Sequence, residues 1–278
     1  MVCAFSLPDL RCILPRVTLS VVLITQNEER NLPHTLESVI PLVRDGKGEI
    51  IVVDSGSTDR TVEIAQSFGA RVFVEPWKGF AAQKNSAMDK ASMEWVLQLD
   101  ADELLEPELA AEIEVALRAG SAMSGFWIPR KNFILGRWIR HGGFYPDPKL
   151  RLVRRGAGRF QEYGAHPTIK VSGPTGRFSH AMVHNAYPTL RGYIDHMNSY
   201  SSMGAEVAMG KGHGAFSLGN IVIRPLLTFI YNYFMRLGFL DGREGLLLHL
   251  YHSVYVSWKY AKAWEMSRKN VASNASTD

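Results

Sequence analysis

Residues 19–28, LSVVLITQNE, contain an almost unbroken aliphatic run that ends in polar residues. Three similar runs follow: EIIVV at 49–53, RVFVE at 71–75 and EWVLQL at 94–99. Runs without polar alternation are typical of strands that are buried on both faces. The sequence therefore predicts four strands, of which the first, second and fourth are followed directly by polar residues that could form a site.

Helical patterns separate these strands. Asn31 is placed to cap one helix, and Ser57 or Thr58 is placed to cap the next. Further helices are expected over residues 80–91 and 109–117. Strands that alternate with helices of this length form right-handed βαβ units. We therefore predict an α/β fold with a mostly parallel, Rossmann-like sheet.

The charge of the chain is unevenly distributed. Lys and Arg total 31 against 27 Asp and Glu, which gives a formal net charge of +4. Residues 130–159 contain nine basic residues and a single acidic one, Asp147. A local excess of this kind predicts an anionic partner, such as a phosphate, a phosphorylated glycan, an anionic membrane or a nucleic acid. No nucleic-acid-binding motif accompanies the charge, so we do not expect a nucleic-acid partner.

The two cysteines, Cys3 and Cys12, both lie near the N-terminus. They form no CxxC pair and no Cys/His cluster, which argues against a disulfide framework or a zinc site and favours a reducing compartment. Residues 1–16 are interpreted as a leader. Asp9 and Arg11 interrupt its apolar stretch, so it does not fit the pattern of a secretory signal peptide.

Acidic residues follow two of the predicted strands, because Asp54 ends one and Asp100-Ala101-Asp102 ends another. Ligands of parallel sheets bind at the carboxyl ends of the strands. Two carboxylates placed two residues apart can hold Mg²⁺ or Mn²⁺ beside a diphosphate. A DxD pattern on its own would more often be the start of the next helix. Together with Thr25–Glu28 and Asp54–Asp59 it forms one constellation along a sheet edge.

Other nucleotide-binding patterns are absent from the sequence. It contains neither GxGxxG nor GxxxxGK[ST], which argues against dinucleotide and P-loop sites. The segments LSVVLITQNEERNLPHTLESV, EIIVVDSGSTDRTVEIAQSFGARV, FAAQKNSAMDKASMEWVLQLDADE and PELAAEI instead resemble the family 2 inverting glycosyltransferases, which have the GT-A fold. The resemblance covers roughly residues 17–119 without an evident gap.

The resemblance implies a set of roles for residues of this chain. Thr25, Asn27 and Glu28 would line the nucleotide pocket, and Asp54 would meet the base. Three more positions acquire a role in the same way: Lys84 near base and ribose, Asp100 at the ribose or the metal ion, and Asp102 as the metal ligand. A Mg²⁺ or Mn²⁺ cofactor and a nucleotide-sugar donor follow from these roles.

Two later segments sharpen the resemblance. GRWIRHGGFYPDPKLRLVRRGAGRF and YNYFMRLGFLDGREGLLLHLYHSVYVSWKYAKAWE are similar to the lipopolysaccharide core β-1,4-glucosyltransferases. Those proteins transfer a sugar, often glucose from UDP-glucose, to the lipid-linked inner core on the cytoplasmic face of the inner membrane. The chain departs from its relatives at Ala165-His166-Pro167, where they commonly have Val-His-Glu, so the role of that Glu is open in this chain.

An inverting transfer needs a base for the acceptor hydroxyl. Asp147 is the first candidate, with a Pro-Asp-Pro turn or a salt bridge to a neighbouring arginine as the equal alternative, and Glu162 is the second. His166 is a candidate diphosphate or metal ligand, and His141 a candidate acceptor contact. The following arginines are candidate contacts to acceptor phosphates or lipid headgroups: Arg151, Arg154, Arg155 and Arg159.

The predicted organisation has five parts, of which the leader 1–16 is the first. Residues 17–119 form the nucleotide-sugar-binding half and residues 120–215 the acceptor-binding half. Residues 216–268 form amphipathic helices that are apolar and aromatic but too interrupted to span a membrane, which favours a peripheral position at a membrane surface. Residues 269–278 are expected to be disordered. A catalytically silent sugar-nucleotide-binding protein and a sugar nucleotidyltransferase remain the alternative functions.

Overall fold

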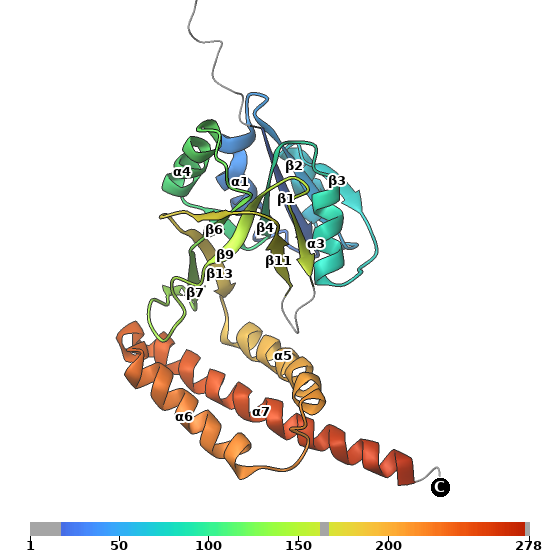
Figure 1. Cartoon of the computed structure of the whole chain (residues 1–278), viewed down its shortest axis with the longest axis vertical. Helices are drawn as coiled ribbons and strands as arrows, with labels where there is room; N and C mark the ends of the chain where they lie inside the picture. The colour runs from blue at the N-terminus through green and yellow to red at the C-terminus, as the bar shows by residue number, and fades with distance from the viewer. Residues whose placement is uncertain (1–17, 162–166, 276–278) are drawn as a thin grey trace, which may run out of the picture.

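The computed structural model describes residues 18–161 and 167–275. It consists of a layered α/β part and a group of long helices that continues from it, as Figure 1 shows. The leader 1–16 lies outside the described residues.

A seven-stranded sheet forms the centre of the α/β part. In sheet order its strands are β12 (Thr175–Arg177), β6 (Gly125–Ile128), β9 (Lys149–Arg154), β4 (Trp95–Asp100), β1 (Leu19–Thr25), β2 (Gly48–Asp54) and β3 (Arg71–Val74). Strands β4, β1, β2 and β3 are mutually parallel, whereas β9 runs antiparallel to both of its neighbours. The predicted mostly parallel α/β sheet is confirmed.

Helices cover both faces of this sheet. They are α1 (Leu32–Val43), α2 (Thr61–Ser67), α3 (Phe80–Asp89) and α4 (Pro107–Arg118). In β1, Leu19, Val21 and Leu23 pack with α1 and α4 on one face, while Val22 packs with α3 on the other. Successive side chains of a strand point to opposite faces, so a strand covered on both sides must be apolar at nearly every position.

Two predicted helix starts are wrong in detail. Asn31 stands at the start of α1, but its side chain makes no capping bond and its Nδ2 donates to Glu28 Oε2 at 2.9 Å. Helix α2 begins at Thr61, later than a cap at Ser57 or Thr58 would require. Ser57 donates to Asp54 instead, because that buried carboxylate needs local hydrogen-bond donors.

A smaller sheet lies beside the main one. Its strands, in order, are β5 (Glu103–Leu105), β13 (Met182–Tyr187), β7 (Arg130–Ile134) and β8 (Arg137–Trp138). Its register pairs His184 with Glu103 on one side and with Asn132 on the other. Three polar residues thus lie in one row across neighbouring strands. A separate hairpin is formed by β10 (Gly158–Gln161) and β11 (Thr168–Val171).

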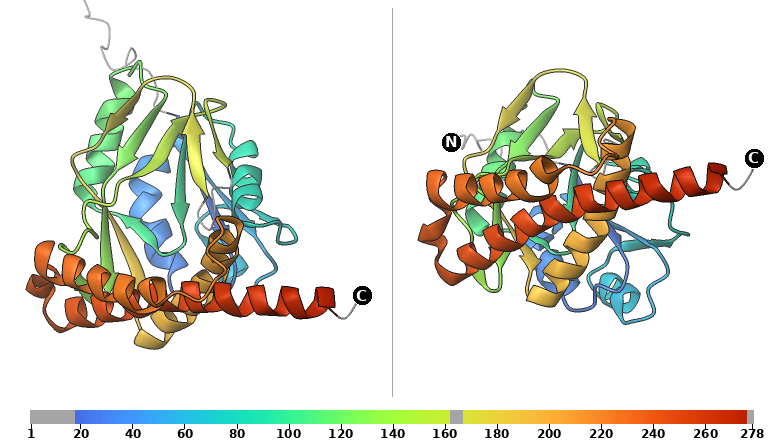
Figure 2. Two further views of the ribbon diagram at one scale, coloured as in Figure 1. Left: turned by 60° about the horizontal axis from the view of Figure 1, so that its bottom comes forward. Right: turned by 90° about the horizontal axis from the view of Figure 1, so that it is seen from below.

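The helical part begins at α5 (Leu190–Gly210), which is earlier than the expected boundary at residue 216. The other elements are η2 (Gly219–Ile223), α6 (Arg224–Ile230), η3 (Tyr231–Met235), η4 (Gly238–Asp241) and α7 (Gly242–Ala275). Small residues on α5, Ala205 and Ala208, pack closely against Ala263 of α7. Because of this packing α5 belongs with the C-terminal helices, which lie together beyond one end of the α/β part in Figure 2.

Helix α7 reaches Ala275, so it extends past residue 268, where disorder was expected to begin. Residues 276–278 lie outside the described part of the chain. Within the described residues, no helix is both long and apolar enough to cross a membrane.

A buried carboxylate joins the two parts. Asp241 is 2% exposed and accepts hydrogen bonds from the backbone N–H groups of Arg140 and His141, at 3.2 and 2.8 Å. Its Oδ1 also lies 2.9 Å from His141 Nδ1. The next residue, Gly142, donates its N–H to the carbonyl of Arg236 at 2.8 Å. The loop after β8 is therefore fastened to the start of α7.

Gly142→Ala is expected to destabilise the protein more than Gly156→Ala. Both glycines have positive φ, +66° and +82°, so alanine at either costs about 1 kcal/mol of backbone strain. Only at position 142 would the new Cβ also collide with a buried ring, 2.0 Å from His249 Cε1, while nothing lies within 4 Å of a Cβ at position 156. Urea denaturation of the two variants checks this, and equal losses would contradict the described junction.

Candidate active site

Asp54 organises the loops at the carboxyl ends of β1 and β2. The side chain is fully buried and accepts from Thr25 Oγ1 at 2.9 Å, from the N–H groups of Gly56 and Ser57 at 2.9 and 2.8 Å, and from Ser57 Oγ at 2.5 Å. These bonds use both carboxylate oxygens. Its structural role is thus to shape the loop, and its contact with a nucleotide base stays a prediction.

The loop after β1 is tied to the same structure. Asn27, at φ 57°, accepts from the Thr58 N–H at 2.8 Å, and its own N–H donates to Ser57 Oγ at 2.8 Å. Glu28 donates its N–H to Thr61 Oγ1 at 2.7 Å, and burial raises the pKa of its carboxyl. The structure therefore places Thr25, Asn27, Glu28 and Asp54 together at one sheet edge, as the sequence predicted.

Asp100 lies at the end of β4 and is surrounded by cations. Its Oδ1 accepts from Lys84 Nζ at 2.5 Å and its Oδ2 from an Arg151 nitrogen at 2.7 Å. Burial alone would raise the pKa of Asp100, but the charges of Arg151 and Lys84 outweigh it and hold the pKa well below its usual range. Asp100 is therefore an ionised carboxylate already neutralised by the protein.

Lys84 shares this environment. The residue is 6% exposed, and burial lowers the pKa of its ammonium. Its partner is the Asp100 carboxylate, so the structure gives Lys84 a role in fixing Asp100. The contact with base and ribose that the resemblance implies stays a prediction.

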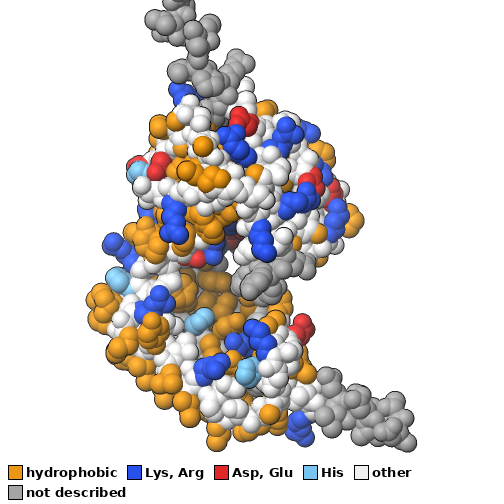
Figure 3. Space-filling view, in the orientation of Figure 1, with side chains coloured by type: hydrophobic (Ala, Val, Ile, Leu, Met, Phe, Trp, Pro, Cys, Tyr) orange, Lys and Arg blue, Asp and Glu red, His pale blue; other side chains and the backbone are white. Residues whose placement is uncertain are grey.

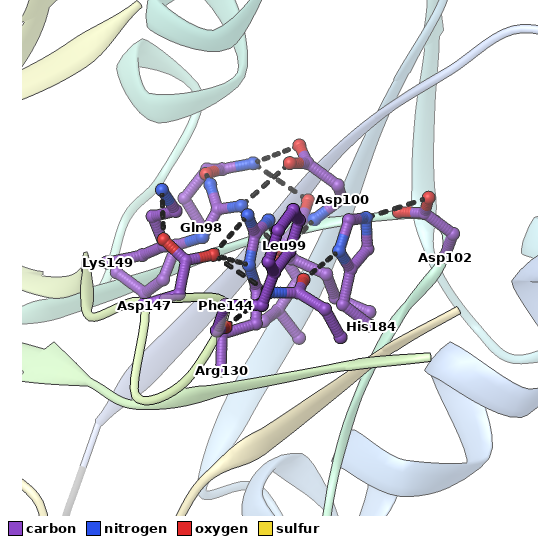
Figure 4. A network of polar contacts seen from close by, with 12 residues as sticks. Gln98, Leu99, Asp100, Asp102, Arg130, Phe144, Asp147, Lys149 and His184 are labelled. Atoms are coloured by element: carbon purple, nitrogen blue, oxygen red, sulfur yellow. Dashed lines mark hydrogen bonds and ion pairs between the residues drawn. The ribbon is translucent and has the colours of Figure 1, made fainter. Parts of the chain in front are cut away.

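A chain of alternating charges continues from Asp100 into the smaller sheet. Glu103 has no exposed surface and accepts from Arg151 at 2.6 Å and from Arg130 at 3.0 Å. Arg130 in turn donates two hydrogen bonds to Asp147 Oδ2, at 2.7 and 3.0 Å. The Asp100 and Asp147 ends of this network appear together in Figure 4.

Asp147 forms the salt bridge that was one of the two alternatives for it. Besides Arg130, its partners are Lys149 Nζ at 2.8 Å and Asn132 Nδ2 at 3.1 Å. Burial by itself would raise the pKa of Asp147, but the Arg130 charge and the Lys149 hydrogen bond outweigh it and lower the pKa. The structure thus provides an ionised carboxylate, and its role as a base stays a prediction.

Asp102 faces a histidine that the sequence did not single out. Its Oδ2 lies 3.3 Å from His184 Nε2, and the two side chains are 30% and 17% exposed. A carboxylate oxygen and an imidazole nitrogen at this separation could hold a divalent cation. The only sequence signal for His184 is a histidine in the mostly apolar run AMVHNAY, which does not reveal that β13 returns beside the DxD segment.

His184 and Asp147 line one pocket of about 240 Å³. Asn132 lies between them, and Phe144 and Tyr187 supply aromatic walls. Burial raises the pKa of the Tyr187 hydroxyl well above its usual range, so Tyr187 is neutral. The pocket therefore lies between strands β7 and β13 and the loop that carries Phe144 and Asp147, beside the contact of His184 with Asp102.

The predicted arginine cluster is not brought together. Arg151 is buried against Asp100 and Glu103, whereas Arg154 pairs with Glu94 and also donates to the Ser121 carbonyl at 2.6 Å. Arg155 is exposed, and Arg159 pairs with Asp89 at 2.7 Å. The sequence shows few acids near these arginines, but the fold brings acids from earlier segments to Arg151, Arg154 and Arg159.

His141 also has a structural partner, because its Nδ1 lies against Asp241 at the junction with the helices. Two other candidates, Glu162 and His166, lie outside the described residues. Among the residues that are described, no group of three or more His, Cys, Asp and Glu side chains is arranged to hold a metal ion. Within these described residues, a cation at Asp102 and His184 would have no third side-chain ligand of these types.

Comparison with known proteins identifies the family of this chain. Residues 20–179 match the model of the family described as Glycosyl transferase family 2. The chain belongs to glycosyltransferase family 2. This confirms the resemblance expected from the sequence, and the α/β part is accordingly a GT-A fold.

A relative that is similar over nearly its full length is the lipopolysaccharide core biosynthesis glycosyltransferase LpsC of Rhizobium meliloti. It is 29% identical over 261 residues, which cover 91% of this chain and 94% of LpsC. Solved structures are more distant. TarS 1–349 of S. aureus has a TM-score of 0.45 at 16% identity, covering 91% of this chain and 92% of that one. Glucosyl-3-phosphoglycerate synthase from Mycobacterium tuberculosis, with Mn²⁺ and UDP, has a TM-score of 0.45 at 20% identity, covering 69% and 79%.

Glu103→Gln is expected to lower the free energy of unfolding by about 3 kcal/mol at pH 7, because it leaves buried cations without compensation. Burial would raise the pKa of Glu103, but Arg151 lowers it below the ordinary value of 4.5. Its stabilisation is therefore present above about pH 4.5 and lost as the pH falls. The difference from wild type should shrink towards pH 3 in urea denaturation curves.

Asp89→Asn is the control for this prediction. It breaks an ion pair with Arg159 whose side chains are 55% and 62% exposed, so little change is expected. A wild-type advantage over the Glu103 variant that is the same at pH 3 and pH 7 would contradict the assignment of a buried, ionised Glu103.

Proposed function

We propose that this family 2 glycosyltransferase moves a sugar, glucose from UDP-glucose in the first instance, onto a lipid-linked glycan such as the lipopolysaccharide inner core. The similarity to LpsC along 91% of the chain supports the class of acceptor. The observation that carries the proposal is the pocket lined by Asp147 and His184, with Asp102 beside His184. It brings a candidate base and a candidate metal site to one small cavity.

The donor would bind at the sheet edge formed by the loops of Asn27 and Asp54. Asp102 and His184 would hold Mg²⁺ or Mn²⁺ there, because oxygen and imidazole donors suit these ions and both side chains are partly exposed. Such a cation stabilises the charge that develops on the diphosphate leaving group. Asp100 fits this role less well, since Lys84 and Arg151 already occupy its oxygens.

The acceptor hydroxyl would enter the pocket and give its proton to Asp147. Arg130 and Lys149 keep this carboxylate ionised but also weaken it as a base. Lys149 is 40% exposed, whereas Arg130 is 15% exposed and held by Glu103. Movement of Lys149 on acceptor binding would therefore free Asp147 Oδ1 while Arg130 keeps the carboxylate in place.

The lipid part of the acceptor would lie at the C-terminal helices. Exposed large apolar side chains gather on α6 and on the short helices η2 and η3 beside it, in the region where Figure 3 shows many orange side chains along the edge of the molecule. Leu226, Leu227 and Met235 are 56%, 58% and 67% exposed. Residues 211–240 contain no Asp or Glu, while Arg224 and Arg236 are exposed there. Apolar and cationic side chains together suit an anionic lipid surface and support a peripheral position of the enzyme on the cytoplasmic face of the inner membrane.

Asp147→Asn is expected to leave UDP-glucose binding intact and to reduce the rate of transfer by about 10²- to 10⁴-fold, because the proton acceptor is lost. Calorimetric titration with UDP-glucose and a transfer assay with purified inner-core lipid measure the two effects. Asp45→Asn, an exposed residue in the turn before β2, is the control. A variant at Asp147 with undiminished turnover would place the base elsewhere.

Leu227→Asp is expected to weaken binding to vesicles that contain anionic phospholipid. The substitution puts a charge into the apolar surface and opposes the negative headgroups. Val115→Asp is the matched control, because Val115 is 68% exposed on α4 in the α/β part. Co-sedimentation measures the bound fraction. Equal loss in both variants, or no loss in either, would contradict a membrane contact at α6.

A further inference from the structure

Asn132 occupies a central position in the pocket, between the two candidate functional groups. It is 6% exposed and lies in β7, directly across the ladder from His184 in β13. Its side chain makes three hydrogen bonds, to His184 Nδ1 at 2.7 Å, to the Phe144 carbonyl at 3.1 Å and to Asp147 Oδ2 at 3.1 Å. It therefore touches both the candidate metal ligand and the candidate base.

The chemistry of these partners fixes which way the amide points. The Phe144 carbonyl and the ionised Asp147 carboxylate can only accept hydrogen bonds, so Asn132 must turn its Nδ2 towards them. A flipped amide would set its oxygen against two acceptor oxygens. Its Oδ1 consequently faces His184 Nδ1, and that ring nitrogen must carry a proton.

This proton position determines what His184 offers to Asp102. With Nδ1 protonated, the neutral ring presents the Nε2 lone pair towards Asp102 Oδ2, 3.3 Å away. Asp102 alone would favour the opposite tautomer, with the proton on Nε2. The shorter contact, 2.7 Å to Asn132 against 3.3 Å to Asp102, decides for the Nδ1–H form. The result is a lone pair and a carboxylate that converge on one point, as a cation requires.

The position of Asn132 is fixed by its backbone hydrogen bonds and by the pairing of its strand. Its carbonyl accepts from the Ile139 N–H at 3.0 Å, and its strand is paired on both sides, with β13 and with β8. A buried side chain on a paired central strand keeps its neighbours in a fixed geometry.

We propose that Asn132 is a positioning residue that sets the tautomer of His184 for metal binding and holds Asp147 in register with it. The proposal rests on the proposed function, because it assigns Asp102 and His184 to the cation and Asp147 to the acceptor. Histidines that bind metals generally donate their second ring N–H to a fixed partner, and loss of that partner costs about 10- to 100-fold in metal affinity. In this chain the partner is a side-chain amide that also reaches the base.

The first test is the tautomer of His184 in the metal-free protein. Nitrogen-15 NMR at alkaline pH distinguishes the two neutral forms of a histidine ring. His184→Gln assigns the signal. Wild type is expected to show the Nδ1–H form, and Asn132→Ala is expected to shift it to Nε2–H, which Asp102 then stabilises. A wild-type His184 protonated on Nε2 would overturn the proposal without any variant.

The second test separates the two contacts of Asn132. Asn132→Asp keeps an acceptor for His184 Nδ1 but removes the donor to Asp147, so the tautomer should persist while transfer falls. Asn132→Ala should lose the tautomer and about 10- to 100-fold in Mn²⁺ affinity, measured by calorimetry with UDP present. Asn185→Ala, the exposed next neighbour of His184, is the control and should change neither.

Unchanged tautomer and unchanged Mn²⁺ affinity in a folded Asn132→Ala variant would overturn the assignment. The tautomer measurement needs no metal ion and no substrate. It therefore decides the role of Asn132 even if wild type binds no Mn²⁺, a result that would instead refute the metal site of the proposed function.

Discussion

The site depends on one buried charge, that of Glu103. A carboxylate with no exposure to solvent must be paired, and Glu103 is paired with Arg151 and Arg130. Each arginine reaches onward to a second carboxylate, Asp100 at the end of β4 and Asp147 beside the pocket. The energetic need to compensate Glu103 thus ties the carboxyl end of β4 to the candidate base.

The smaller sheet places the candidate metal ligand His184 next to this charge network. Its register sets Glu103, His184 and Asn132 side by side, so the charge network and the candidate metal ligand share one scaffold. The C-terminal helices reach the same place from the other side. Asp241 holds the loop at Arg140 and His141, and the chain continues from there to Phe144 and Asp147, which line the pocket. The helices that carry the exposed apolar surface are therefore attached to the segment that carries the candidate base.

Much of this could be predicted from the sequence where the signal was local. Apolar runs that end in Asp54 or Asp100 identify buried strands and the edge at which their ligands bind, because burial on both faces leaves a pattern in consecutive residues. The pairing of His184 with Asp102 could not be predicted in this way, since it depends on the register of β13 beside β5. The arginines after residue 150 were misjudged for the same reason. Their acidic partners, among them Asp89 and Glu94, come from a distant part of the chain and are visible only in the fold.

We propose that Asp102 and His184 together form the cation site of this family 2 glycosyltransferase. A crystal structure of the protein grown with UDP and Mn²⁺, with anomalous diffraction recorded near the manganese absorption edge, tests this site directly. One strong anomalous peak is expected within coordination distance of both Asp102 Oδ2 and His184 Nε2, with diphosphate oxygens completing the coordination. A peak held by Asp100 in place of Asp102, or bound UDP with no peak beside His184, would contradict the proposal.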